Sequence, residues 1–336
     1  MCHCGAVDVL SREEGSARCL HCGRIHPVSP RGVIDFAQKK TEQSSYFDGI
    51  YAAGHLHKID ELYETSIRTY ENSIETSEAY LKLCGYDFTH PLEGLSILDV
   101  ACGSGWVTAG LLQHKLIRNC NFHAFDISSH GPESLARFAE TVQSTNRLEM
   151  SVQDAEAMAF GEAYFDIIIG SSVLHHFNEV EPFLRKCKRI LKPGGVATFG
   201  EPFAVGYGLG AAVIMLAQKQ LGTTYQAVED LYNDIAYRIK SPRELLTNLV
   251  DKHLFFQSSF LTLAQRTGFK DVQFVPLAPR DFYRDHFIDE LLSERAISDT
   301  ALAGLAKEMY KTMFALFDTE SFGHSAAAFI QLVMHT

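Results

Sequence analysis

From residue 96 onward, segments with the pattern of buried strands alternate with segments that have the period of helices. Residues 96–100 (SILDV) and 165–172 (FDIIIGSS) are short apolar runs, whereas residues 106–113 (WVTAGLLQ) and 181–192 (EPFLRKCKRILK) have helical apolar spacing. The expected strands are residues 96–100, 121–127, 150–155, 165–172, 196–202, 271–277 and 325–336. This alternation predicts an α/β fold in which parallel strands form a doubly wound sheet.

The end of the first expected strand restricts the ligand most. Asp99 lies in this strand, and Gly103 and Gly105 lie where the next helix begins. Glycine allows positive φ and a close approach of the backbone, and the N-terminus of a helix offers unpaired N–H groups to an anionic group. Because ligands of open α/β sheets bind at the carboxyl ends of the strands, we expect a binding site here.

The next two strands also end in acids. Asp126 follows the glycines by about 20 residues, where a carboxylate can accept both hydroxyls of a ribose, and Asp154 ends the third strand. A dinucleotide-binding loop would have a third glycine at position 108, where this chain has Thr108. The pattern therefore favours a nucleoside that bears a carboxylate and an ammonium over a nicotinamide dinucleotide.

Five motifs in this region resemble those of one enzyme family. LDVACGSG, FDIS, QDAEAMAF, FDIIIGSSVLHHF and LKPGGVATFGEP occur in the order and spacing found in class I S-adenosylmethionine-dependent methyltransferases of the type 11 kind. The resemblance covers residues 95–277. It implies a Rossmann-like, seven-stranded methyltransferase sheet that binds S-adenosyl-L-methionine.

The resemblance also implies which residues bind the cofactor. Asp99, Gly103 and Gly105 would surround its methionyl end, and Asp126 would bind the ribose. Asp154 and Ala155 would face the adenine, and Ser171 would lie beside the sulfonium. The implied cofactor-binding residues are Asp99, Ala101, Gly103, Gly105, Trp106, Asp126, Ile127, Asp154, Ala155 and Ser171.

Three residues are candidates for catalysis. His175 and His176 follow the fourth strand, and Glu201 lies near the end of the fifth. An imidazole can take a proton from a hydroxyl during methyl transfer, and a neighbouring carboxylate can orient it. The alternative is that the histidine pair is a structural turn.

The N-terminal cysteines predict a structural zinc site. Cys2, Cys4, Cys19 and Cys22 form two pairs, each followed by a glycine that allows a tight turn. In a chain without an export signal, such pairs indicate metal ligation more than disulfides. The first pair is one residue shorter than the usual spacing, so a nearby histidine could replace one thiolate. The histidines considered are His3, His21 and His26.

Residues 1–36 as a unit resemble the zinc ribbon that precedes some class I methyltransferases, and the ribbon is expected to span residues 1–38. The matching pieces are CHCG, CLHCG, the turn at residues 26–28 and the exit GVIDF at residues 32–36. Residues 39–90 are expected to form a helical lead-in or lid, and residues 91–336 the methyltransferase domain. Insertions at about 203–256 and 280–322 are expected to add helical caps, whose apolar and aromatic residues favour a small or lipophilic acceptor.

The net charge of −11 disfavours a broad nucleic-acid-binding face. No run of about 18 or more apolar residues and no secretory signal is found, so neither a membrane span nor export is predicted and the cytoplasm is the expected location. We therefore expect a methyltransferase of secondary metabolism that methylates a hydroxyl of a small molecule. An RNA methyltransferase and a non-catalytic cofactor-binding protein are the alternatives; the sequence leaves the methylated atom and the oligomeric state open.

Overall fold

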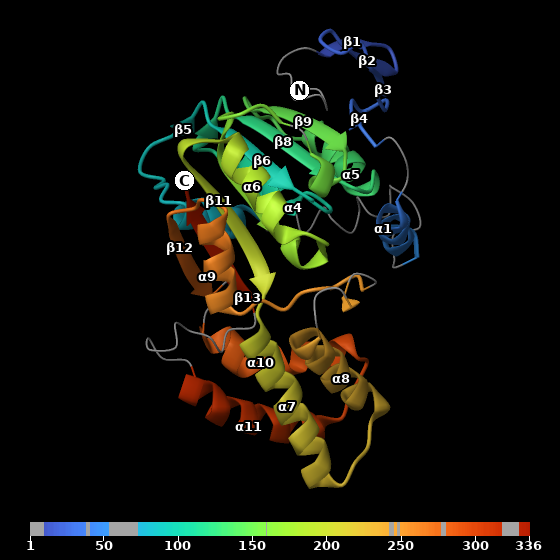
Figure 1. Cartoon of the computed structure of the whole chain (residues 1–336), viewed down its shortest axis with the longest axis vertical. Helices are drawn as coiled ribbons and strands as arrows, with labels where there is room; N and C mark the ends of the chain where they lie inside the picture. Colours follow the sequence, from blue (N-terminus) through green and yellow to red (C-terminus); the bar gives the residue numbers. More distant parts are fainter. Residues whose placement is uncertain are drawn as a thin grey trace.

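The computed structural model of the chain contains a mixed sheet of eight described strands, shown in Figure 1. The described residues are 10–37, 41–53, 73–158, 160–241, 245–246, 249–276, 280–317 and 329–336. The strands, in their order across the sheet, are β12 (Asp271–Pro276), β13 (Phe329–His335), β11 (Leu191–Pro202), β10 (Phe165–Ser171), β6 (Ser96–Val100), β8 (Asn121–Asp126), β9 (Arg147–Val152) and β4 (Ile34–Asp35). Within this described sheet, β13 runs antiparallel to both of its neighbours, β11 and β12, and the other strand pairs are parallel. The predicted α/β class with a central, largely parallel sheet is thus confirmed.

The central strands are apolar along their length because helices cover both faces of the sheet. Ile97 and Ile169 pack into the core on one face, and Leu98 and Ile168, one residue away in each strand, pack into the core on the other. The helices that contribute to the first core are α3 (Ser73–Leu83), α4 (Trp106–Gln113) and α5 (His130–Ala139), and those of the second are α6 (Val180–Ile190) and α9 (Gln257–Arg266).

The prediction of seven strands is wrong by one, because the N-terminal segment adds a strand to the sheet. In β4, Ile34 pairs with Ser151 and Asp35 with Val152, parallel to β9. The N–H of Phe36 then donates to the carbonyl of Val152 at 2.9 Å. These bonds satisfy backbone groups that an edge strand would otherwise expose. The GVIDF segment, expected to be the exit of a zinc ribbon, therefore belongs to the main sheet.

A small antiparallel sheet precedes this edge. Its strands are β1 (Leu10–Glu13), β2 (Ser16–Cys19) and β3 (Ile25–Pro27). Ala17 from this sheet packs with Ile34 and Phe36, which attaches the small sheet to the edge of the large one. The predicted zinc ligands Cys2 and Cys4 lie outside the described residues.

Four helices form a second layer beyond the carboxyl end of β11 (Figure 1). They are α7 (Ala204–Leu221), α8 (Gln226–Lys240), α10 (Arg280–Glu294) and α11 (Thr300–Phe317). Helices α7 and α10 pack closely, because a Cβ added at Gly210 would lie 2.7 Å from Leu291 and 2.9 Å from Phe287. The buried side chains of this layer are continuous with the core under the sheet. We call these four helices the cap.

Among the described residues, no helix has both the length and the apolar character that crossing a membrane requires.

Candidate active site

The loop after β6 closes tightly on helix α5. Gly105 has φ +80° at the N-cap of α4, a conformation that favours glycine. Gly131, the second residue of α5, touches the same loop, since an added Cβ would lie 1.6 Å from the carbonyl oxygen of Gly103. The glycine at position 131 therefore lets α5 approach the loop, a role that the sequence motif did not reveal.

Asp126 holds this loop from the end of β8. One carboxylate oxygen accepts the N–H of Gly103 at 2.9 Å, and the other accepts the N–H of Ser128 at 2.9 Å. The side chain is buried, and burial raises the pKa of its carboxyl above the ordinary value. Its oxygens retain further acceptor capacity toward a ligand, because each carries two lone pairs.

Asp99, in strand β6, is buried like Asp126. Its carboxylate accepts a hydrogen bond from the hydroxyl of Thr108 at 2.6 Å, so the residue in place of a third glycine is the partner of this acid. Burial raises the pKa of Asp99 to about 7, although the Thr108 bond acts in the opposite direction.

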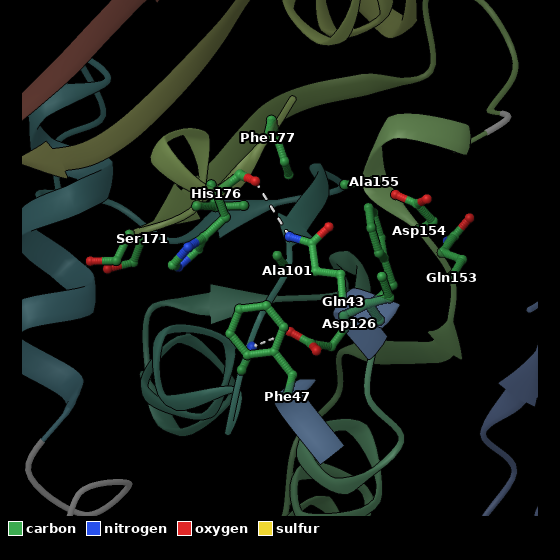
Figure 2. A pocket seen from close by; sticks show the side chains of 15 residues that line it. Gln43, Phe47, Ala101, Asp126, Gln153, Asp154, Ala155, Ser171, His176 and Phe177 are labelled. Atoms are coloured by element: carbon green, nitrogen blue, oxygen red, sulfur yellow. Dashed lines mark hydrogen bonds between the residues drawn. The ribbon is translucent and has the colours of Figure 1, made fainter. Parts of the chain in front are cut away.

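A cavity of about 230 Å³ lies at the carboxyl ends of the parallel strands (Figure 2). Seven of the ten predicted cofactor-binding residues line it: Ala101, Gly103, Asp126, Ile127, Asp154, Ala155 and Ser171. Asp99, Gly105 and Trp106 are not among the lining residues. The residues that sequence reasoning missed are Gln43, Phe47, Phe125, Gln153, Ser172, Val173 and Phe177. We call this the cofactor cavity.

Helix α1 (Glu42–Ala53) contributes two of the missed residues. Figure 2 shows Gln43 and Phe47 directed toward His176. The amide of Gln43 donates to the His176 carbonyl at 3.4 Å, and the Phe47 ring meets the His176 ring edge-on at 5.3 Å. Asp48 accepts a hydrogen bond from Ser128 at 2.7 Å, which fixes the helix to the far side of the cavity. The sequence predicted helices over residues 39–90, but it contains no motif that indicates contacts between residues so far apart along the chain.

Glu201 and His175 form a buried pair beside this cavity. Glu201 is fully buried at the end of β11 and accepts the N–H groups of Val173 at 2.9 Å and Leu174 at 2.7 Å. His175 Nδ1 lies 2.7 Å from its other oxygen. A carboxylate that receives several N–H donors is an acceptor, so Nδ1 of His175 donates a proton to it, and in the neutral ring Nε2 then carries the lone pair.

Asp251 lies close to both His175 and His176. Its carboxylate oxygen lies 3.2 Å from His176 Nδ1 and 3.8 Å from His175 Nε2. The hydrogen bond from His176 lowers the pKa of Asp251 to about 2. Nearby, Lys252 donates its N–H to the His175 carbonyl at 2.8 Å and its ammonium to the His176 carbonyl at 2.9 Å, which holds the turn η2 (Leu174–His176) in place.

The two imidazoles and the Asp251 carboxylate could also hold a metal ion, because one ligand atom from each lies within 4.8 Å of the others. Nitrogen and oxygen donors of this kind suit divalent transition metals, and a carboxylate partner such as Glu201 on the opposite ring nitrogen is common among metal-bound histidines. The same arrangement serves proton transfer at Nε2.

A second cavity, of about 250 Å³, lies between the strand ends and the cap. It is lined by Ser172, His175, Pro202, Tyr207, Leu231, Asp234, Ile235, Arg238, Asp251, Leu254, Glu294 and Arg295. Ser172 lines both cavities, while His176 lines the first and His175 the second. Ser172 has φ +57°, an uncommon conformation for serine that places its backbone at this junction. We call this second space the cap cavity.

The second predicted zinc pair, Cys19 and Cys22, lies in a tight turn among the described residues. The N–H of Cys22 points to Cys19 Sγ at 3.4 Å, and the N–H of Gly23, with φ +75°, donates to the Cys19 carbonyl at 2.8 Å. Among the described residues, neither His21 nor His26 forms a three-ligand cluster with these cysteines.

The sheet, the glycine loop and the cavity at the strand ends define a Rossmann-like α/β domain built to bind a nucleotide-like ligand. Residues 98–199 match a family model described as a methyltransferase domain. These residues of the chain therefore form a methyltransferase domain.

Two kinds of curated relative match part of the chain. A ubiquinone biosynthesis O-methyltransferase from Chelativorans sp. is 34% identical over 128 residues, which cover 37% of this chain and 47% of the relative. A highly reducing polyketide synthase from Pyrenophora dematioidea is 30% identical over 204 residues, 57% of this chain and 8% of the synthase. The chain thus spans less than half the length of either relative.

A solved structure shares the fold. Phosphoethanolamine N-methyltransferase 2 from Haemonchus contortus, in complex with S-adenosyl-L-methionine, superimposes with a TM-score of 0.50 at 16% identity. The match covers 86% of this chain and 60% of that one.

Proposed function

We propose that the protein transfers a methyl group from S-adenosyl-L-methionine to a hydroxyl of a small molecule held in the cap cavity. The observation that carries the proposal is the position of His175 and His176, one in the wall of each cavity, with Ser172 shared by both. The partial match to O-methyltransferases supports oxygen as the acceptor atom.

The cofactor would occupy the first cavity. Asp126 would accept the ribose hydroxyls, Asp154 and Ala155 would contact the adenine, and Ser171, which receives a hydrogen bond from Tyr80 at 3.2 Å, would lie beside the sulfur. Asp99 would act behind the loop, through Thr108, because it does not line the cavity.

His175 would be the general base. When bound, the cofactor supplies an electrophilic methyl group on a positively charged sulfur. His175 lines the cap cavity, and its Nε2 would accept the proton of the acceptor hydroxyl as the oxygen attacks. Glu201, bonded to Nδ1, keeps the ring in this tautomer and stabilises the imidazolium that forms. The remaining catalysis comes from aligning oxygen, methyl and sulfur.

The experiment that tests this function follows a labelled methyl group. Purified protein and methyl-labelled cofactor are incubated with a metabolite extract and, separately, with total RNA. Label in a small molecule, as a methyl ether, is the expected result. Label in RNA alone would favour the RNA alternative, and no label in either fraction despite cofactor binding would favour the non-catalytic one.

We further propose that residues 1–38 bind one structural zinc through Cys2, Cys4, Cys19 and Cys22. The turn at the second pair supports this assignment. Purified protein should contain about one zinc per chain. Cys19→Ser combined with Cys22→Ser should release it while leaving cofactor affinity unchanged; native protein that is metal-free with unmodified thiols would contradict the site.

The proposed units are therefore this ribbon, a helical lead-in over residues 39–90 that includes α1 and α3, and a catalytic domain over residues 91–336. The cap helices α7, α8, α10 and α11 come from its two insertions. In this division the lead-in covers the cofactor cavity and the insertions enclose the acceptor.

A further inference from the structure

The apolar residues of the cap cavity offer little surface to a ligand. Leu231 and Ile235 are each 2% exposed and Leu254 is 7% exposed. These three side chains belong to the core that the cap shares with the sheet. The apolar pattern of the insertions, which favoured a lipophilic acceptor, is therefore used mainly for packing.

The exposed lining of the same cavity is polar. The side chains of Asp251, Asp234 and Arg295 are 56%, 38% and 34% exposed. Glu294 is also exposed. A ligand in this cavity therefore meets mainly hydrogen-bonding groups. We call these groups the polar wall, and its members are Ser172, His175, Tyr207, Asp234, Arg238, Asp251, Glu294 and Arg295.

Charges of both signs are interleaved along the polar wall, which holds three carboxylates and two guanidiniums. Asp234 lies 3.2 Å from Arg238 and 3.8 Å from Arg295, so each guanidinium already faces a carboxylate. Asp251 is engaged with the histidine pair. Burial raises the pKa of Glu294, while Arg295 and Arg238 act on it in the opposite direction. A charged ligand would therefore meet groups of its own sign as well as groups of the opposite sign.

A hydroxyl group suits such a wall because it adds no charge. It can donate to a carboxylate and accept from a guanidinium, and both of these groups retain hydrogen-bonding capacity beyond one ion pair. Burial raises the pKa of Tyr207, so its hydroxyl stays protonated and can donate as well. A molecule with several hydroxyls can therefore satisfy donors and acceptors of the wall at the same time.

We infer that the acceptor is a neutral, polyhydroxylated small molecule, such as a sugar or another polyol, which the polar wall binds through hydrogen bonds with one hydroxyl at His175. This inference rests on the proposed function and names its substrate class. The cavity volume of about 250 Å³ lies below the usual range of ligand pockets, so the enclosed part of the acceptor is small.

The first test classifies the methylated product by charge and polarity, so the acceptor need not be known in advance. The full chain is incubated with methyl-labelled cofactor and a metabolite extract, and a blank without extract is subtracted. The label is then separated by organic extraction, by anion exchange and by cation exchange at acid pH, which also retains zwitterions. It should remain in the aqueous fraction that neither exchanger retains. Label in the organic phase or on either exchanger would overturn the inference.

A second test measures binding of matched probes to the full chain saturated with S-adenosylhomocysteine, by saturation-transfer NMR. The neutral probes are the methyl glycosides of glucose, galactose and mannose, and each is compared with its amino sugar, its uronate and cyclohexylmethanol. At least one neutral sugar should bind at least about fivefold more tightly than all three of its counterparts, as expected for a few hydrogen bonds. Preference for a charged or apolar counterpart, or no binding of any neutral sugar, would contradict the inference.

Paired substitutions separate hydrogen bonding from charge. Glu294→Gln and Arg295→Gln remove a charge but keep hydrogen-bonding groups, and should weaken sugar binding by about threefold or less. Glu294→Leu and Arg295→Leu remove both, and should weaken it by about tenfold or more. Arg266→Leu is the matched control and should have no effect, because this exposed arginine pairs with Glu181 at 3.0 Å and does not line the cavity. Equal losses in the glutamine and leucine variants would contradict recognition by hydrogen bonds.

Binding of S-adenosylhomocysteine and methyl transfer, measured on the same samples, separate this inference from the proposed function. Transfer to a charged or lipophilic small molecule counts against the polyol acceptor alone. Absence of homocysteine binding, or of label in every small-molecule fraction, counts against the proposed function itself.

Discussion

Burial of Asp99 couples the stability of the protein to pH. The pKa of this carboxyl is raised to about 7 in the folded state from an ordinary value of 3.8, with burial as the main cause. Between these two values the folded protein binds a proton that the unfolded chain has released. Stability contributed by protonated Asp99 is therefore present at acid pH and is lost as pH rises through about 7.

Replacing Asp99 with asparagine should remove this pH dependence. The neutral amide can still accept the Thr108 hydroxyl, so at pH 8 the variant should be more stable than the wild type by on the order of 3 kcal/mol, and at pH 4 about equally stable. Urea unfolding at both pH values measures this. Thr108→Val, which removes the donor that lowers this pKa, should move the transition to higher pH. An Asp99→Asn variant less stable at pH 8 would contradict the account.

The role of His175 makes a separate prediction about turnover. His175→Ala should reduce turnover by about 10²–10⁴ with nearly unchanged affinity for S-adenosylhomocysteine, because a general base acts only in the chemical step. The loss should shrink as pH rises, since an ionised hydroxyl needs no base. Glu201→Gln should give a smaller loss in the same direction.

A chelator distinguishes proton transfer by His175 from metal binding by His175, His176 and Asp251. If His175 acts as a base, EDTA should leave turnover unchanged. Loss of activity on chelation in the Cys19→Ser, Cys22→Ser variant, restored by a divalent metal, would assign the His175, His176 and Asp251 set to metal binding instead.

At the scale of elements, the contact between α5 and the glycine loop controls the shape of the cofactor cavity. Gly131→Ala would place a methyl group against the Gly103 carbonyl, where the Cβ distance would be 1.6 Å, so the loop must shift. Affinity for S-adenosylhomocysteine, measured by calorimetry, should fall by about tenfold or more. Gly304→Ala in α11, where no heavy atom lies within 4 Å of the added Cβ, is the matched control and should not change it. Equal affinity in both variants would contradict this role of α5.

Elements with a strong apolar pattern could be predicted from the sequence, and elements defined by distant contacts could not. The strands that end at Asp126 and Ser171 are largely apolar, and their carboxyl ends meet at the same edge of the sheet. Strand β4 has only two residues and exists because β9 offers it an open edge. Gln43 reaches the cofactor cavity through a bond to His176, 133 residues away, which no local period encodes.

At the scale of the whole molecule, two cavities meet at one turn between the sheet and the cap. Residues at the strand ends line both cavities, α1 contributes to the first, and α7, α8 and α10 contribute to the second. The motifs at the strand ends lie within the residues that match the methyltransferase domain. The caps carry no such motif, so the position of Arg238 in the second cavity emerged only from the fold.

The most direct test of the central claim is a calorimetric titration of the full chain with S-adenosylhomocysteine and with NAD, repeated with Asp126→Ala. The account predicts one binding site for S-adenosylhomocysteine, no binding of NAD, and a loss of roughly 1.5–3 kcal/mol in the variant, as for hydrogen bonds to a charged group. Binding of NAD without binding of S-adenosylhomocysteine, or unchanged affinity in Asp126→Ala, would contradict it.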